Sequence, residues 1–199
     1  MRKFCLTIIV LAGFSKALFA QFGNCTASEM QTYTDRETGN TITILTDTLK
    51  NDRFLYQTDP MWTHDGKYLL FRSSSRANDK KIERTLPNGE KRSWTPTQIY
   101  FIEMATGQII QATEGPDLGS AFLANKSNRM FISRKEKEDW NMYVMDLDKF
   151  FADVKKGKVG KPTAYETLLG TFPTSMGRPG GYAIDCNDDY AYITVEREG

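Results

Sequence analysis

The chain has 199 residues, of which 40% are hydrophobic and 12% aromatic, and it contains one histidine and three cysteines. Its 26 basic and 25 acidic side chains give a formal net charge of +1 at pH 7, with no basic block long enough to follow a phosphate backbone. These numbers argue against nucleic acid as a partner and against a small disulfide-stapled scaffold.

The first twenty residues have the pattern of a secretory signal peptide. Arg2 and Lys3 give a basic start, residues 4–14 form an apolar run, and small residues within 17–20 precede Gln21. The apolar run is too short to anchor the chain across a bilayer. We therefore expect residues 1–20 to be removed, which leaves 21–199 as an exported, periplasmic or secreted product with no membrane span.

Two cysteines remain after this cut. Cys25 and Cys186 are expected either to pair with each other in an oxidising compartment or to be buried as small apolar side chains.

Short strand-like segments dominate the rest of the chain. Each is rich in β-branched or aromatic residues and is bounded by Gly, Asn, Asp or Pro, which is typical of an all-β domain built from hairpins. The predicted strands cover 40–46, 68–72, 98–104, 108–112, 129–133, 141–147 and 190–195. One segment, 148–156, predicts a helix of one or two turns where a hairpin turn is expected. A long polar stretch, 80–91, is expected to be a B-C loop that either caps a site or is simply a mobile hairpin.

Two markers recur along the sequence. A polar turn followed by a strand occurs at 63–67, 124–128 and 185–189, at intervals of about sixty residues, which is a blade-like spacing. A second marker, Glu37-Thr38-Gly39-Asn40, matches the segment 105–108, where Gly supplies the positive φ of a tight hairpin. With strands labelled A to D outward from an axis, the markers predict the order C-D, A-B-C-D, A-B-C-D, A-B.

This order predicts an all-β fold, a partial β-propeller of about three four-stranded blades, where a closed ring takes about four to eight. Because repeated blades stabilise each other by stacking, we expect 21–199 to be the N-terminal part of a longer propeller, whose remaining blades are its partner. The competing interpretation is a β-sandwich of similar length.

The first complete unit carries a resemblance. Residues 60–71 (PMWTHDGKYLLF), 98–101 (QIYF) and 105–107 (ATG) resemble the WD40-like repeat of TolB-type propellers, a pattern that indicates fold and is silent on function. Before it come, in order, Tyr33-Thr34-Asp35, Thr38-Gly39, Ile44-Leu45-Thr46, Asp52-Arg53 and Tyr56-Gln57. This order over about 31–111 is similar to the N-terminal part of oligogalacturonate lyases. Thr63-His64 replaces the usual Ser-Pro, and the later turn motifs are degenerate.

The resemblance implies a seven-bladed ring and a polysaccharide lyase that cleaves acidic oligosaccharides of pectin by β-elimination at a uronic acid. It also implies a divalent metal, typically manganese, that neutralises the sugar carboxylate, and a histidine base. The chain contains only His64, in an A-B turn on the face opposite the B-C and D-A loops where propeller sites gather. We expect His64 to be an exposed turn residue, with the catalytic base and the metal ligands outside this chain.

Arginines end the predicted B strands on the functional face. Arg72, Arg134 and Arg197, with Arg178 in a Gly-rich loop, would form a ring that holds anionic sugar units by bidentate contacts, with Trp140 or Trp94 as a stacking surface. The alternative is that they are solvated loop charges, partly cancelled by neighbouring glutamates.

A further set of aromatic residues at alternating strand positions predicts blade core instead of a site. The set is Trp62, Phe71, Tyr100 and Phe131.

Two other functions remain open on the sequence. A non-enzymatic TolB-type propeller would bind protein or peptide partners on the same face. The propeller of a serine peptidase would need a hydrolase domain, and no segment of this sequence begins one.

Overall fold

The elements of the protein follow the predicted order of strands. The computed structural model describes residues 22–77, 81–85, 88–115, 118–137, 139–173, 175 and 178–196. The elements are β1 (Cys25–Thr26), β2 (Gln31–Thr34), β3 (Thr41–Ile44), β4 (Asp52–Arg53), β5 (Tyr68–Ser73), β6 (Ile82–Thr85), β7 (Lys91–Trp94), β8 (Gln98–Glu103), β9 (Ile109–Gln111), β10 (Leu118–Leu123), β11 (Arg129–Glu136), β12 (Asp139–Asp146), α1 (Leu147–Lys155), the 3-10 turn η1 (Pro162–Ala164), β13 (Glu166–Phe172), β14 (Arg178–Ile184) and β15 (Ala191–Glu196). The predicted signal peptide lies outside the described residues.

The first blade is the sheet β4-β5-β8-β9 with β1 added at its outer edge. Its A strand is broken, because β4 pairs with β5 over two residues and Trp62 then makes an isolated bridge to Leu69. The added strand β1 was not predicted. Gly23 N–H donates to Gln111 O and Gln111 N–H donates to Asn24 O, at 2.7 and 2.9 Å, so the N-terminal segment covers the edge of β9.

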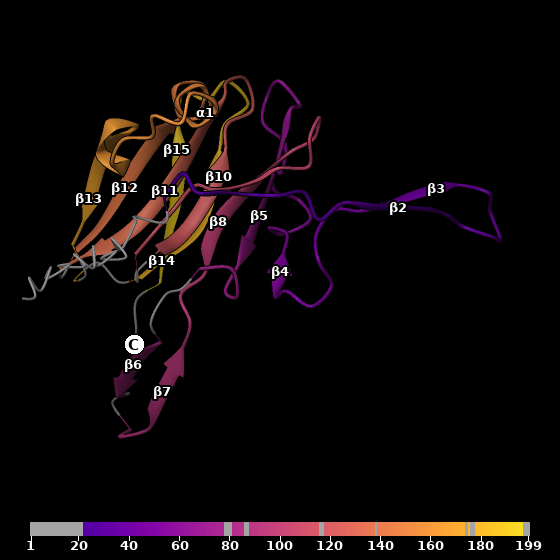
Figure 1. Cartoon of the computed structure of the whole chain (residues 1–199). Helices are drawn as coiled ribbons and strands as arrows, with labels where there is room; N and C mark the ends of the chain where they lie inside the picture. Colours follow the sequence, from indigo (N-terminus) through magenta and orange to yellow (C-terminus); the bar gives the residue numbers. More distant parts are fainter. Residues whose placement is uncertain are drawn as a thin grey trace, which may run out of the picture.

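The second blade is the antiparallel sheet β10-β11-β12-β13, and β14 and β15 form a half-blade after it. Consecutive strands are neighbours in each blade, as in a propeller, and the Greek-key connections of a β-sandwich do not occur among the described strands. Two hairpins stand apart from the blades. In Figure 1, β2-β3 projects to one side and β6-β7, which forms within the polar stretch 80–91 and its flank, projects at the end opposite α1.

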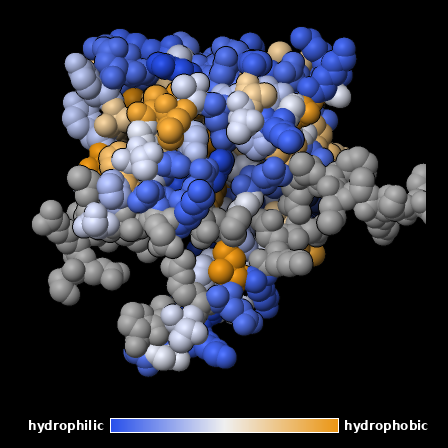
Figure 2. Space-filling view, turned by 90° about the vertical axis from the view of Figure 1, so that its left-hand side faces the viewer, coloured by the Kyte–Doolittle hydropathy of each residue, from blue (hydrophilic) through white to orange (hydrophobic). Residues whose placement is uncertain are grey.

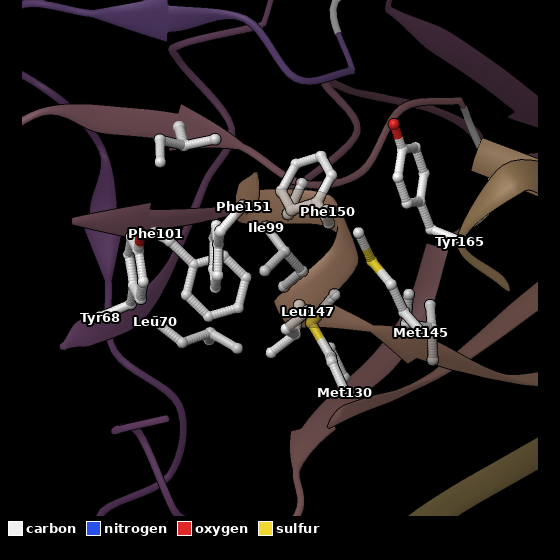
Figure 3. Close-up of a cluster of buried hydrophobic side chains, with 14 of the residues drawn as sticks. Tyr68, Leu70, Ile99, Phe101, Met130, Met145, Leu147, Phe150, Phe151 and Tyr165 are labelled. Carbon is white, nitrogen blue, oxygen red and sulfur yellow. The ribbon is translucent and has the colours of Figure 1, made fainter. Parts of the chain in front are cut away.

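The helix α1 joins the two blades. It begins at the cap Asp146, whose side chain accepts a hydrogen bond from Lys149 N–H. The Phe151 ring stacks on Tyr68 of the first blade with a centroid distance of 3.7 Å and meets the Phe101 ring edge-on at 5.1 Å. Figure 3 shows these rings in one cluster with side chains of the second blade. The predicted helix is therefore confirmed, and its role is to fill the space between the blades.

Phe150, the residue before Phe151 in α1, extends the same cluster to the N-terminal segment. Phe150 packs against Phe22 and Tyr165, with centroid distances of 5.0 and 5.5 Å. At the end of α1, Lys155 Nζ lies 2.8 Å from Glu103 Oε1 of the first blade. A single buried cluster thus spans both blades, the helix and the residues before β1.

The A-B turns are hydrogen-bonded from blade to blade. The His64 ring Nδ1 lies 2.9 Å from Asn125 O, which links the first turn to the second. The second turn is linked to the third because the Asp188 carboxylate, with a side chain 1% exposed, accepts from Asn125 N–H and Lys126 N–H at 2.6 and 2.8 Å. These contacts fix the angle between successive blades at the end that carries α1.

Two predictions about burial are wrong. Trp62 is 47% exposed, because it lies on the irregular A strand, on the side of the first blade that no other described blade covers; the other three predicted core aromatics are buried. Cys25 and Cys186 are neither paired nor buried. Both lie at exposed positions, Cys25 on the two-residue edge strand β1 and Cys186 in a turn.

The surface mixes hydrophobic and hydrophilic side chains (Figure 2). On the face in Figure 2, hydrophobic side chains form small separate patches among hydrophilic ones. No helix in the described part of the chain is long and apolar enough to cross a membrane.

Phe151→Ala should lower the free energy of unfolding by about 3–5 kcal/mol, because it removes a ring that fills the space between two blades. The measurement is urea unfolding followed by circular dichroism. Phe54→Ala is the matched control, since Phe54 is 49% exposed and its truncation should cost less than about 1 kcal/mol. Equal losses in the two variants would contradict the assignment of α1 as the joint between the blades.

The protein should lose stability in acid, where the Asp188 carboxylate becomes protonated. Burial alone would raise the pKa of Asp188, but the N–H groups of Asn125 and Lys126 and the Ser127 hydroxyl hold the pKa below its usual value. A depressed folded pKa adds stability that is fully present above the unfolded pKa, near 4, and is lost as the pH falls through the folded pKa.

Asp188→Asn, which keeps a side chain suited to the positive φ of 63° at this position, should therefore lower stability at pH 7 by about 1–3 kcal/mol. The difference from the unmodified chain should shrink by pH 3. The control is Asp189→Asn at the exposed neighbouring position, which should leave the pH dependence unchanged in urea titrations at each pH.

Candidate functional site

A cleft of about 660 Å³ opens between the first and second blades. It lies at the end of the sheets that carries the B-C and D-A connections, where the sequence analysis expected a site. Its walls are the β4 and β5 ends of the first blade, residues 94–97 before β8, and the start of β10. The lining residues used below are Arg53, Tyr56, Asp59, Arg72, Trp94 and Ser120.

One buried arginine holds the first wall in place. The Arg76 side chain, 7% exposed, donates to the Asp52 carboxylate through Nε at 2.9 Å and to Glu29 through Nη1 at 2.9 Å. Burial alone would lower the pKa of Arg76, but these hydrogen bonds raise it, and they lower the pKa of Glu29. Because guanidinium–carboxylate pairs of this kind are bidentate and directional, the two-residue strand β4 is fixed against the end of β5.

This anchor determines where Arg53 points. Successive side chains of a strand point to opposite faces, so Asp52 reaches Arg76 and Arg53 points into the cleft. Arg53 lies directly opposite Arg72 in the β4-β5 register. Such neighbours have Cβ atoms about 5 Å apart, and like charges at that separation destabilise the pair.

Neither arginine is neutralised by a neighbour. Among the residues described, Arg53 and Arg72 make no ion pair and no side-chain hydrogen bond, and both are exposed. Among the described residues that line the cleft, Asp59 is the one acidic side chain. Two guanidinium groups that converge without a carboxylate partner provide what an anionic ligand needs, because each offers a planar fork of N–H donors.

Aromatic rings flank the paired arginines. Trp94, at the end of β7, and Tyr56, in the segment after β4, are both exposed and both line the cleft. Flat rings of this size present apolar area with a polar edge, which suits the C–H face of a sugar. The arrangement combines anion recognition with a stacking surface.

The structure places the predicted binding residues in different surroundings. Arg72 lines the cleft. Arg134 donates to the Glu166 carboxylate at 2.8 and 3.2 Å, and that glutamate side chain is 2% exposed. Burial alone would lower the pKa of Arg134, and the Glu166 hydrogen bond raises it. Arg134 is thus engaged in an internal ion pair of the second blade.

Trp140 lies on the other face of the second blade from Arg134. It pairs with Lys135 in the β11-β12 register, one step away from Arg134. A Cβ atom at Gly119 would come within 2.8 Å of the Trp140 ring, so the absence of a side chain at Gly119 lets the ring pack against β10. Arg178 belongs to β14, its side chain lies outside the described atoms, and Arg197 lies outside the described residues.

The strand register shows why Arg72 and Arg134 are not equivalent. The turn hydrogen bond from Thr63 N–H to Tyr68 O recurs between residues 124 and 129 and between residues 185 and 190. Arg72 lies four residues after Tyr68, which accepts this bond in the first blade. Arg134 lies five residues after Arg129, which accepts it in the second. A shift of one residue moves a side chain to the other face of a sheet, so Arg72 and Arg134 do not hold equivalent positions of the repeat. Arg134 is instead held by Glu166 within the second blade.

The described residues do not fit a metal site. They contain no cluster of three or more His, Cys, Asp or Glu side chains that could hold an ion. His64 is exposed, as expected, and contacts Asn125 in an A-B turn at the other end of the blades from the cleft.

Sequence reasoning missed Arg53. Its segment has no strand periodicity, and β4 pairs over two residues only. The one local signal is the adjacent acid Asp52, which becomes informative only when Arg76 is known to bind it.

The chain was compared with known proteins. No protein-family model and no curated protein matches it. Similar solved structures include an oligogalacturonate lyase in complex with manganese, with 19% identity and a TM-score of 0.57, and an oligogalacturonate lyase from Vibrio parahaemolyticus, with 20% identity and a TM-score of 0.56.

The alignments cover 84% and 83% of this chain but 36% and 35% of those chains, so this chain spans about a third of their length. At this identity the likeness establishes the fold: the chain is mostly β and matches part of a propeller-fold lyase.

Truncating Arg134 and truncating Arg72 should have very different effects on the free energy of unfolding. Arg134→Ala leaves the buried Glu166 carboxylate without its partner and should cost about 3–5 kcal/mol. Arg72→Ala removes a like-charge contact with Arg53 and should change the free energy of unfolding by less than about 0.5 kcal/mol, or raise it. Urea unfolding of both variants at low and high salt measures this. A large loss for Arg72→Ala would mean that Arg72 has an internal partner and is not held for a ligand.

Proposed function

We propose that this chain is the N-terminal part of an exported, oligogalacturonate lyase-like propeller that binds uronic-acid oligosaccharides between its first two blades. The observation that carries the proposal is the convergence of Arg53 and Arg72, without an acidic partner, beside Trp94 in the cleft. The fold likeness to part of such lyases supports the sugar class.

The cleft residues would act by binding and orienting the ligand. A carboxylate of one sugar unit accepts hydrogen bonds from the Arg53 and Arg72 guanidinium groups, which removes the repulsion between them. Trp94 then covers the apolar face of the ring, and Ser120 on the opposite wall supplies a hydroxyl for the sugar's own hydroxyl groups. Binding through two charged groups and one ring fixes both position and orientation.

Elimination itself needs groups that these residues do not supply. Removing the proton beside a uronic carboxylate requires a base and a positive group at the developing enolate. The described residues contain no metal cluster, and His64 lies at the opposite end of the blades. In this proposal the base and the metal ligands of the complete enzyme lie outside this chain, and the chain itself binds and orients the ligand.

Digalacturonate should bind to the chain, and the uncharged disaccharide of galactose should not. Each charge-assisted hydrogen bond is worth about 1.5–3 kcal/mol, so Arg53→Ala and Arg72→Ala should each weaken binding by about tenfold to a hundredfold in calorimetric titrations. Higher salt should weaken it further, because the ligand is anionic.

Arg92→Ala is the control for charge alone, since Arg92 is exposed on β7 beside Glu90 and does not line the cleft. Equal binding of the uncharged disaccharide, or unchanged binding in both cleft variants, would contradict the proposal. An acidic peptide that binds more tightly than the sugar through the same arginines would favour a peptide-binding propeller instead.

The chain alone should form no unsaturated product from digalacturonate with or without added manganese, because it lacks the base. The measurement is ultraviolet absorbance of the unsaturated uronate. Turnover by this chain would place a base among the residues present here and overturn the division of roles given above.

A further inference from the structure

The hairpin β6-β7 extends outward from the candidate site. It stands apart from the blades at the end opposite α1, where the cleft opens (Figure 1). Its last residue, Trp94, belongs to the cleft lining, whereas the described charged residues of the hairpin lie farther out and do not. These outer charges take no part in the binding proposed above.

The register of the hairpin determines which residues share a face with Trp94. Ile82 lies opposite Trp94, and Arg84 lies opposite Arg92. Residues two apart in a strand share one face of a sheet, and so do residues directly opposite each other in a pair. The face that carries Trp94 therefore continues into a pair of basic positions, two residues farther from the cleft.

The other face of the hairpin has a different composition. It carries Glu83 opposite Ser93 and Thr85 opposite Lys91. One acidic and one basic residue cancel each other on this face. The paired arginine positions thus belong to the side of the hairpin that the cleft lining continues into.

Arg92 is only weakly engaged by a neighbour. Its Nε lies 3.2 Å from Glu90 Oε1, and the two side chains are 64% and 51% exposed. A pair as exposed as this contributes little to stability, because water screens the charges and both side chains lose rotamer freedom. A carboxylate of a ligand can therefore take the place of Glu90 at small cost.

The spacing along β7 separates Arg92 from the cleft. Two residues of a strand span about 7 Å, so Arg92 lies more than the width of one sugar ring beyond Trp94. A two-unit sugar that is held by Arg53 and Arg72 and covered by Trp94 does not extend that far. A longer chain that leaves the cleft over the Trp94 ring does.

We infer that the β6-β7 hairpin is an outer subsite, in which Arg92 holds a further carboxylate of a uronic-acid chain longer than two units. This inference rests on the proposed function, because it takes the cleft to hold the first units. An oligouronate has one carboxylate on every unit, so its charge is spread along its length. Guanidinium groups in the cleft and on the hairpin, separated by an aromatic ring, are spread in the same way.

The test compares digalacturonate with tetragalacturonate in calorimetric titrations at low salt, where exposed charges are least screened. Arg92→Ala should weaken tetragalacturonate binding about twofold to fivefold, as expected for one exposed charge pair. It should not change digalacturonate binding, because the shorter ligand does not reach Arg92. For the same reason this variant serves as the charge control for the two-unit ligand.

Lys91→Ala is the matched control. Lys91 is exposed and adjacent to Arg92 in β7, and its loss changes the net charge by the same amount. It lies on the other face of the hairpin, opposite Thr85. Lys91→Ala should therefore leave the binding of both ligands unchanged.

Glu90→Gln tests the same subsite by a gain of binding, which damage to the fold does not produce. It removes the carboxylate that competes for Arg92, so tetragalacturonate should bind about twofold to fivefold more tightly. Digalacturonate binding should stay the same. Glu83→Gln makes the same charge change on the other face of the hairpin and should affect neither ligand.

The outcomes separate the subsite from the cleft. Equal effects of Arg92→Ala and Lys91→Ala on tetragalacturonate, or of Glu90→Gln and Glu83→Gln, would show that the hairpin acts only through its net charge. That result would overturn the outer subsite and leave the cleft proposal standing. Digalacturonate that fails to bind, or that binds equally well after Arg72→Ala, would overturn the proposed function and the subsite with it.

Discussion

The fold of this chain depends on the aromatic packing of a nine-residue helix between two sheets. Each blade is apolar on both faces, and a twisted sheet cannot cover its neighbour without a side chain that fits the space between them. Phe150 and Phe151 supply that fit, because adjacent residues of α1 reach the N-terminal segment and the first blade respectively. The resulting cluster contains residues of both complete blades, the helix and the segment before β1, so these parts stabilise one another cooperatively.

The packing at one end of the sheets leaves an opening at the other. The A-B turns are tied together by Asp188 and His64 at the end that carries α1, so the blades are held closely there. At the B-C end no such ties occur between the described strands of the first and second blades, and the cleft forms. The position of the candidate site is thus a consequence of where the interblade contacts lie.

Charge is used in two different ways on neighbouring residues. Arg76 is buried with two carboxylates and holds β4 in place, whereas Arg53 and Arg72 are exposed and unneutralised. Arg134 resembles Arg76 in being paired internally with Glu166. The distinction separates guanidinium groups that stabilise the fold from those that remain available to a ligand, and it cannot be made from the residue type.

Open strand edges occur in the half-blades at both ends of the strand order. The strand order places a C-D half-blade before the complete blades and an A-B half-blade after them, and both have main-chain groups that lack partners among the described strands. Antiparallel pairing is specified by turn geometry and alternation, so each open edge has a defined direction of its main-chain hydrogen-bonding groups.

The sequence by itself determined the strand order, the turn markers and the helix, because these depend on local periodicity and on glycine and aspartate at fixed positions in turns. The pairs β8-β9 and β11-β12 and the hairpin β2-β3 all follow from such local patterns. The exposed position of His64 followed in the same way, since the face of a turn is set by the strand order.

Only the tertiary structure decided which side chains meet. Arg53 lies opposite Arg72 because Arg76, distant in sequence, anchors Asp52, and Arg134 is turned to the other face by one step of register. Trp62 is exposed because no other described blade covers its side of the sheet. Periodicity assigns a residue to a face of a strand. Contacts between segments far apart in the chain determine which residue it meets on that face.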